Sequence, residues 1–182
     1  MLENNFQKTI EAEILELPLM QYEWCTPNEL TFKGEVREIC RLECPMYGKS
    51  WSCPPAVGTV EECKNRCMEY KGMFLFTTIA EVSDIANMKE TLETRYEHEE
   101  ITRKIGTIFK NQGAEILLLS SESCSICDSC AYCAGEACRH PEYMIPCIES
   151  QGILVTELAE KYEIPFLDSL TTVQWFGLIL YR

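Results

Sequence analysis

Twelve cysteines in a chain of 182 residues restrict its fold and chemistry more than any other feature. They fall into two groups, within residues 25–67 and within residues 124–147, and residues 68–123 contain none. In a reducing cytoplasm, spaced cysteines serve metal binding or redox chemistry rather than a disulfide framework. Because only two histidines are present, the metal donors must be mainly thiolates, which suit iron–sulfur clusters or zinc bound by four cysteines.

Charge and the N-terminal segment predict the compartment and the class of partner. The chain begins with an acidic segment and lacks the basic start and apolar stretch of an export signal. Its longest apolar runs, near residues 116–119 and 176–181, are far shorter than the ~20 residues of a membrane-spanning helix. The net charge of −13 repels nucleic acid and anionic membrane surfaces and attracts basic proteins. We therefore expect a cytoplasmic protein with a redox partner protein, no nucleic acid and no membrane.

Apolar patterns predict the strands and helices. Runs over residues 73–80, 114–119 and 172–181 predict buried strands, and residues 11–17 and 30–36 predict two shorter ones. Helices are expected after a capping box at Thr59 and Glu62, over residues 84–112 with Ser83 or its neighbour as the cap, and over residues 152–162.

The order of these elements predicts an α/β or α+β fold. With 46% apolar residues, the chain can bury a core as one cysteine-rich metal-binding (iron–sulfur) domain over residues 1–182. We expect a mixed β-sheet covered by helices, with two cysteine-rich metal-binding loops.

The second cysteine group has the spacing Cys124-x2-Cys127-x2-Cys130. Three thiolates separated by two residues each can reach different iron atoms of a cubane. Zinc more often takes two short pairs separated by a longer span, so the spacing favours a [4Fe–4S] cluster. The fourth ligand must come from elsewhere, and the candidates, in order of preference, are Cys138, Cys133 and Cys147.

Arg139 directly follows the preferred fourth ligand. A guanidinium there can donate hydrogen bonds to cluster sulfurs and offset the negative charge of the cluster, which would tune its potential. The alternative is an arginine that faces solvent. His140 is expected to be a loop residue rather than a ligand.

The first cysteine group supplies Cys40, Cys44 and Cys53 as a second ligand set. Tyr47, followed by a glycine, supplies a turn between them, and Trp51 supplies an apolar cover that limits water. The alternative is a structural loop packed on Trp51.

A fourth ligand for this first set is not evident from spacing. Cys63 and Cys67 share one face of a predicted helix, so either can complete the set, or both can be small buried residues. If neither binds, one iron stays open and can act as a Lewis acid or take a substrate sulfur. Cys25 is expected in the core, and His98 on a solvated helix face.

The two motifs resemble those of an uncharacterised family of predicted metal-binding proteins. The likeness covers the chain from about Val36 onward, and Cys133 and Cys147 stand outside the family pattern. The resemblance implies metal binding, with iron–sulfur as the expected kind, and it implies no particular reaction. The matching segments are Cys40-x3-Cys44-x2-Tyr47-Gly48-x2-Trp51-x-Cys53-Pro54-Pro55, Cys124-x2-Cys127-x2-Cys130 leading to Cys138-Arg139-x-Pro141, and Gly152-Ile153 before a final apolar strand.

The leading hypothesis is an iron–sulfur protein for electron transfer. We call Cys40, Cys44 and Cys53 the first motif, and Cys124, Cys127, Cys130 and Cys138 the second motif. The second motif would hold one [4Fe–4S] cluster and the first motif another. One rival is a cluster-dependent enzyme for sulfur transfer or small-molecule redox at an open iron, with an anionic substrate bound by Arg37, Arg41 or Lys49. The other rival is a structural zinc-binding interaction protein.

Overall fold

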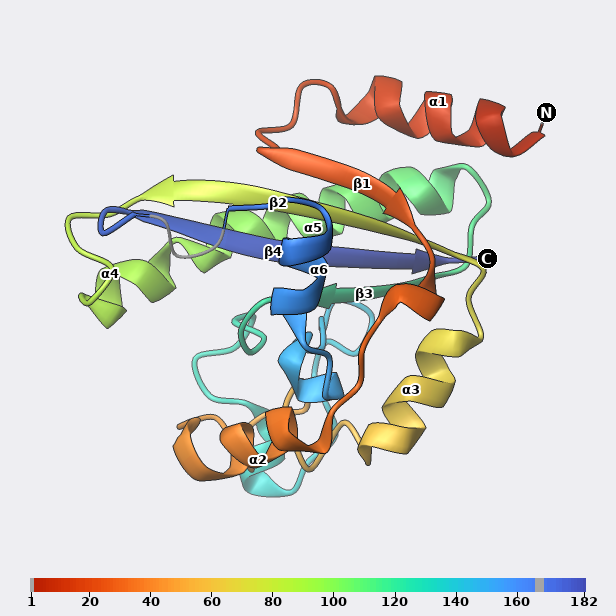
Figure 1. Cartoon of the computed structure of the whole chain (residues 1–182). Coiled ribbons are helices and arrows are strands. Elements are labelled where there is room, and N and C mark those ends of the chain that lie inside the picture. The colour runs from red at the N-terminus through yellow and green to blue at the C-terminus, as the bar shows by residue number, and fades with distance from the viewer. Residues whose placement is uncertain (1, 166–168) are drawn as a thin grey trace.

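The computed structural model describes residues 2–165 and 169–182. At its centre lies a four-stranded sheet with the strand order β1-β2-β4-β3 (Figure 1). All three pairings between neighbouring strands are antiparallel. The strands are β1 (Gln21–Cys25), β2 (Gly72–Glu81), β3 (Ile116–Ser120) and β4 (Thr172–Tyr181).

Helices lie on both faces of this sheet, so the predicted class, helices packed on a β-sheet, is confirmed. The sequence suggested a mixed sheet; the pairing is antiparallel because the last strand, β4, runs between β2 and β3 and opposite to both. The helices are α1 (Leu2–Ile14), α2 (Gly34–Glu43), α3 (Val60–Met68), α4 (Met88–Glu93), α5 (Arg95–Asn111) and α6 (Val155–Lys161).

One face of the sheet packs against α1 and α5 (Figure 1). Ile10 and Ile14 of α1, with Ile105 and Phe109 of α5, are buried there against Phe74 of β2. Full burial of a side chain of this size contributes roughly 1.5–3 kcal/mol. This face therefore supplies much of the driving force for folding without using any cysteine.

The opposite face packs against α3, α6 and the cysteine-rich loops. Met73 and Leu75 of β2 and Leu178 of β4 point to this side, because successive side chains of a strand alternate between the faces. Cys67 of α3 and Leu158 of α6 cover them. The second core thus lies between the sheet and the loops and holds the loops in place.

Several predicted elements are confirmed. The three long apolar runs form β2, β3 and β4, and residues 155–161 of the short C-terminal helix form α6. The capping box is present at the start of α3, where the Thr59 hydroxyl accepts from the Glu62 N–H at 3.2 Å and the Glu62 carboxylate accepts from the Thr59 N–H at 2.7 Å.

The predicted strand over residues 11–17 is wrong, because most of it belongs to α1. Alternation of apolar and charged residues suggested a strand, but Phe6, Ile10 and Ile14 recur at the helical spacing of four. Ile10 and Ile14 are buried against the sheet and Phe6 packs beside them. Tertiary packing of this stripe therefore decides the conformation.

The predicted strand over residues 30–36 is also wrong. Phe32 makes one isolated bridge with Ile153, and α2 begins two residues later at Gly34. The pairing stays this short because the chain turns from the bridge directly into a helix.

The long helix predicted over residues 84–112 is two helices, α4 and α5, which meet at Thr94. The cap of α4 is Asn87, whose side-chain oxygen accepts a backbone hydrogen bond, and not Ser83. The Thr94 hydroxyl accepts a hydrogen bond from the Trp175 indole at 2.8 Å. The junction between the helices is therefore fastened to β4.

The prediction of a solvated His98 is wrong. Its side chain is 1% exposed and lies between the Thr78 hydroxyl, at 2.8 Å, and the Phe176 carbonyl, at 3.0 Å. Burial lowers the pKa of His98 to about 4, although the hydrogen bond to the Phe176 carbonyl opposes this in part. The imidazole is therefore neutral in the folded protein at pH 7.

Substitution of Gly177 by alanine should destabilise the fold. The added Cβ would lie 2.2 Å from the ring of Phe76, which is fully buried. We expect the free energy of unfolding, measured by urea denaturation, to fall by about 1–3 kcal/mol, the usual cost of overpacking. Gly34→Ala is the matched control, since no atom lies within 4 Å of its added Cβ. Equal losses in the two variants would contradict this packing.

Burial of His98 should make stability fall as the pH is lowered from about 6.5 to about 4. In this window the unfolded chain binds a proton that the folded chain excludes, so the contribution is complete above pH ~6.5 and is lost on acidification. We expect His98→Gln to weaken this dependence in denaturation curves recorded at several pH values. His140→Gln, at a loop position, should keep it; identical curves for all three proteins would refute the burial argument.

Candidate metal centre

The loop that carries the second motif starts and ends at the same edge of the sheet. It leaves β3 at Ser120 and returns at Cys147, which forms a parallel bridge with Ser120. The Ser120 N–H donates to the Pro146 carbonyl at 3.1 Å, and the Ile148 N–H donates to the Ser120 carbonyl at 2.9 Å. The returning segment thus extends the sheet by one short pairing, which closes the loop.

Ser52 joins the two motifs. It is fully buried, and its hydroxyl accepts a hydrogen bond from the Cys124 N–H at 2.9 Å. Its carbonyl accepts from the Cys147 N–H at 3.1 Å. Because Ser52 directly precedes Cys53, the loop of the first motif is held against the start and the end of the second loop.

All four cysteines of the second motif line one narrow hollow of about 20 Å³. Trp51 lines the same hollow; its indole donates to the Glu136 carbonyl at 3.0 Å, and its ring meets the edge of Tyr132 at 4.9 Å. Trp51 was expected to cover the first motif. The structure instead places its side chain against the second, as an apolar wall beside the four thiols.

The other two candidates for the fourth ligand lie elsewhere. Cys133 is exposed, and its thiol donates to the Lys49 carbonyl at 3.3 Å. Cys147 is buried beside Cys53 of the first motif. Of the three candidates, Cys138 is the one that lines the hollow with Cys124, Cys127 and Cys130, and its role as a ligand stays a prediction.

The environment of the second motif favours thiolate at Cys130. Burial raises the pKa of Cys130, but hydrogen bonds from the backbone at Tyr132 and Trp51 and the positive charge of Arg139 outweigh it, so that the pKa lies below its usual value. Burial dominates at Cys124 and raises its pKa. Arg139 also donates to the Ser129 carbonyl at 2.9 Å, so it both braces the loop and supplies positive charge.

The first motif gathers its three cysteines beside α2. Burial raises the pKa of Cys53 to about 12, and the nearby charges of Cys44 and Cys40 raise it further. Burial also raises the pKa of Cys40, and the nearby Cys44 raises it further. These mutual effects mean that the three sulfurs lie within electrostatic reach of one another. Tyr47 sits in the turn between them, where its N–H donates to the Cys44 carbonyl at 3.2 Å.

Cys147 is a fourth thiol at the first motif, which sequence reasoning assigned only to the second. Burial raises its pKa well above the usual value, with further contributions from Glu149 and from Cys53. Its thiol donates to a Glu149 carboxylate oxygen at 3.0 Å. No spacing rule could have placed it there, because the contact depends on the pairing of the returning loop with Ser120.

The cysteines of α3 do not join the first motif. Cys67 is fully buried in the core beside Met73, and Cys63 is also fully buried, with the Val57 carbonyl at 3.4 Å. Cys25 lies in the core, where its thiol donates to the Met73 carbonyl at 3.4 Å. All three positions fit the expectation of small buried residues.

Of the three basic side chains that could bind an anionic substrate, two already have partners and one is exposed. Arg37 donates to the carbonyls of Ser150 and Gly58, at 2.5 and 2.7 Å. Arg41 pairs with Glu38 on the surface of α2, and Lys49 is exposed. Arg37 therefore acts as a brace between loops.

The thiols of the second motif lie around the hollow and not at one point. Among residues 2–165 and 169–182, no three side chains of the His, Cys, Asp and Glu types stand close enough to hold one metal ion. In a cubane, by contrast, each thiolate binds a different iron atom. Four thiols line one hollow, and backbone donors are aimed at two of them.

Comparison with known proteins identifies a family. The family described as Predicted metal-binding protein (DUF2284) matches residues 23–181. No curated protein and no solved structure matches the chain. Within the described residues, no helix has the length and apolar character needed to cross a membrane.

In the metal-free, reduced protein, Cys130 should react with iodoacetamide faster than Cys124. Both thiols line the same hollow, but the pKa of Cys130 is lowered and that of Cys124 is raised. Since the thiolate is the nucleophile, we expect faster labelling of Cys130 at pH 7.5, followed by peptide mass spectrometry. Faster labelling of Cys124 would show that the backbone donors do not control this loop.

Proposed function

The chain belongs to the family of predicted metal-binding proteins (DUF2284), and on this premise we propose that it is an iron–sulfur protein. The second motif holds a [4Fe–4S] cluster. The first motif, completed by Cys147, holds a second cluster. The protein transfers single electrons between these clusters and a redox partner protein.

One observation carries this proposal: four thiols from a single loop surround one hollow. The backbone donors at Cys130 and the charge of Arg139 favour the thiolate form that a metal requires. Hydrogen bonds to the sulfurs and limited water access are the means by which proteins set cluster potentials. Trp51 and Tyr132 supply the apolar wall here. A bound cluster would supply one-electron chemistry, and these residues would hold and tune it.

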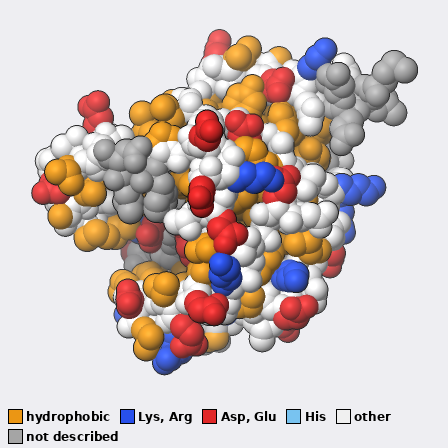
Figure 2. Space-filling view, viewed as in Figure 1, with side chains coloured by type: hydrophobic (Ala, Val, Ile, Leu, Met, Phe, Trp, Pro, Cys, Tyr) orange, Lys and Arg blue, Asp and Glu red, His pale blue; other side chains and the backbone are white. Residues whose placement is uncertain are grey.

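The surface charge supports a basic partner. Acidic side chains are spread over the face seen in Figure 2 and outnumber the basic ones there, as the net charge of −13 requires. Such a field accelerates encounter with a positively charged protein. Electron transfer would then depend on ionic strength.

A second candidate function, a cluster-dependent enzyme, is favoured by Glu149. Its carboxylate accepts from the Cys147 thiol and also lines a cavity large enough for a small molecule. A ligand in that cavity would lie beside the first motif. Small-molecule redox at that motif is therefore the alternative to simple electron transfer.

The second motif should lose its cluster when Cys130 is replaced by serine. We expect the Cys130→Ser variant, purified without oxygen, to contain about four fewer iron and sulfide per chain than the unmodified protein. Cys133→Ser is the matched control from the same loop, because this exposed residue does not line the hollow. Equal iron contents in the two variants would contradict the proposed ligand set.

Replacement of Cys147 should remove the iron of the first motif, and replacement of Cys67 should not. Cys147→Ser removes the thiol beside Cys53, so we expect it to lose the iron of the first motif and keep that of the second. Cys67→Ser changes a fully buried cysteine in the core. The folded fraction of this variant should contain as much iron per chain as the unmodified protein. Full iron content in Cys147→Ser, measured beside its visible spectrum, would remove Cys147 from the proposal.

A further inference from the structure

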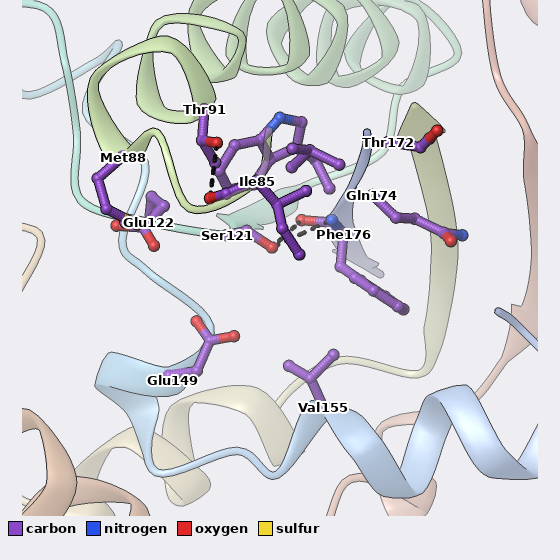
Figure 3. Close-up of a pocket in the computed structure, with 12 residues that line it drawn as sticks. Ile85, Met88, Thr91, Ser121, Glu122, Glu149, Val155, Thr172, Gln174 and Phe176 are labelled. Atoms are coloured by element: carbon purple, nitrogen blue, oxygen red, sulfur yellow. Dashed lines mark hydrogen bonds between the residues drawn. The ribbon is translucent and has the colours of Figure 1, made fainter. Parts of the chain in front are cut away.

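A cavity of about 320 Å³ opens between α4, β4 and the start of α6 (Figure 3), and its two glutamates lie within electrostatic reach of the first motif. Ile85, Met88 and Val155 give it apolar walls. Glu122, near the start of the second loop, and Glu149, just past its end, point into the cavity (Figure 3). Cavities of this size with a few convergent polar groups are typical of small-molecule sites.

The Ser121 and Thr91 hydroxyls at the cavity are already paired. The Ser121 hydroxyl accepts from the Phe176 N–H at 3.0 Å, and the Thr91 hydroxyl donates to the Ile85 carbonyl at 3.2 Å. Gln174 points away from the carboxylates (Figure 3). The side-chain nitrogen of Gln174 has no hydrogen-bond partner among the described residues, so it is the acceptors free for a ligand that are concentrated on Glu122 and Glu149.

The two carboxylates lack a cationic partner in the cavity wall. No lysine or arginine is among the described residues that line it, and no described residue donates a hydrogen bond to Glu122. Glu149 accepts from the Cys147 thiol and from its own backbone N–H. Arg95 acts on Glu122 electrostatically but does not line the cavity. Carboxylates beside apolar walls are costly unless a donor or a cation meets them.

The backbone at Glu122 supports a functional role. Its φ of 66° places a glutamate in the left-handed region, which is costly for a residue with a side chain and which clusters at functional sites. Glu122 lies two residues before Cys124, and Glu149 two residues after Cys147. The two carboxylates of the cavity therefore lie at the start and just past the end of the loop that carries the second motif.

We propose that this cavity binds a small organic base, with an apolar body and a protonated amine or amidinium head, beside the first motif. The head donates hydrogen bonds to Glu122 and Glu149, and the body lies against Ile85, Val155 and Trp175. The negative charge of the whole chain raises the local concentration of such a cation. This binding goes beyond the proposed function and does not require either cluster.

A matched probe series on the unmodified protein tests the charge preference. Benzylamine and benzamidine carry the proposed head, benzyl alcohol is the neutral counterpart, and benzoate is the anionic one. Calorimetric titration should give saturable binding of the two bases, at least about tenfold tighter than that of the alcohol or the acid, because hydrogen bonds to charged groups are the stronger ones. Equal affinity across the series, or preference for benzoate, would overturn the proposal.

A pair of glutamate variants tests the location. Glu122→Gln should weaken benzamidine binding about tenfold, because it removes a charge and keeps the shape. Glu16→Gln, at an exposed position outside the cavity, should leave it unchanged. Equal binding by both variants would place the base elsewhere and refute this site. Iron measured on the same samples separates the two proposals: binding without iron would contradict the clusters alone, and iron without binding would contradict the cavity alone.

Discussion

The arrangement of the thiols depends on the hydrogen bonds of Ser52. Its hydroxyl holds the Cys124 N–H and its carbonyl holds the Cys147 N–H, so one buried residue connects the beginning and the end of the second loop to the first motif. A buried hydroxyl without these partners would cost on the order of 1–3 kcal/mol. Together with the hydrogen bonds of Trp51 to the Glu136 carbonyl and of Cys133 to the Lys49 carbonyl, these contacts hold the two cysteine groups side by side although they are far apart in sequence.

The two faces of the sheet have different roles: one forms an apolar core without cysteines, and the other supports the cysteine-rich loops. One face packs against α1 and α5 through large apolar side chains, among them Ile105 and Phe109. The other face carries a smaller share of helix and supports the loops at the end of β3, where the returning segment pairs with Ser120. The core on the first face contains no cysteine. The thiols outside the core can therefore be committed to metal without weakening the packing of that face.

Sequence patterns predicted the parts of the structure that local rules determine. Long apolar runs gave β2, β3 and β4, and the spacing at Cys124 gave a set of thiols that share one hollow. The strand predicted at residues 11–17 failed because tertiary packing of Ile10 and Ile14 overrides local alternation. Burial of His98 and the position of Cys147 depend on contacts between segments that are distant in sequence. No single-sequence pattern encodes contacts of that kind.

The same difference between local patterns and contacts of distant segments applies to the candidate metal centre. Loop spacing indicated which cysteines lie together, whereas the partner of each loop was visible only in the fold. Trp51 illustrates this: it belongs to the first loop in sequence and to the second hollow in space. Glu122 and Glu149 carried no motif, and only the φ of Glu122 and the shape of the cavity draw attention to them.

The content of iron, acid-labile sulfide and zinc per chain, measured after purification without oxygen, tests the central claim most directly. Two cubanes require about eight iron and about eight sulfide, with a broad absorption band near ~400 nm. Four of each would contradict a cluster at the first motif. Stoichiometric zinc without sulfide would contradict iron–sulfur chemistry altogether and would leave a structural zinc protein in its place.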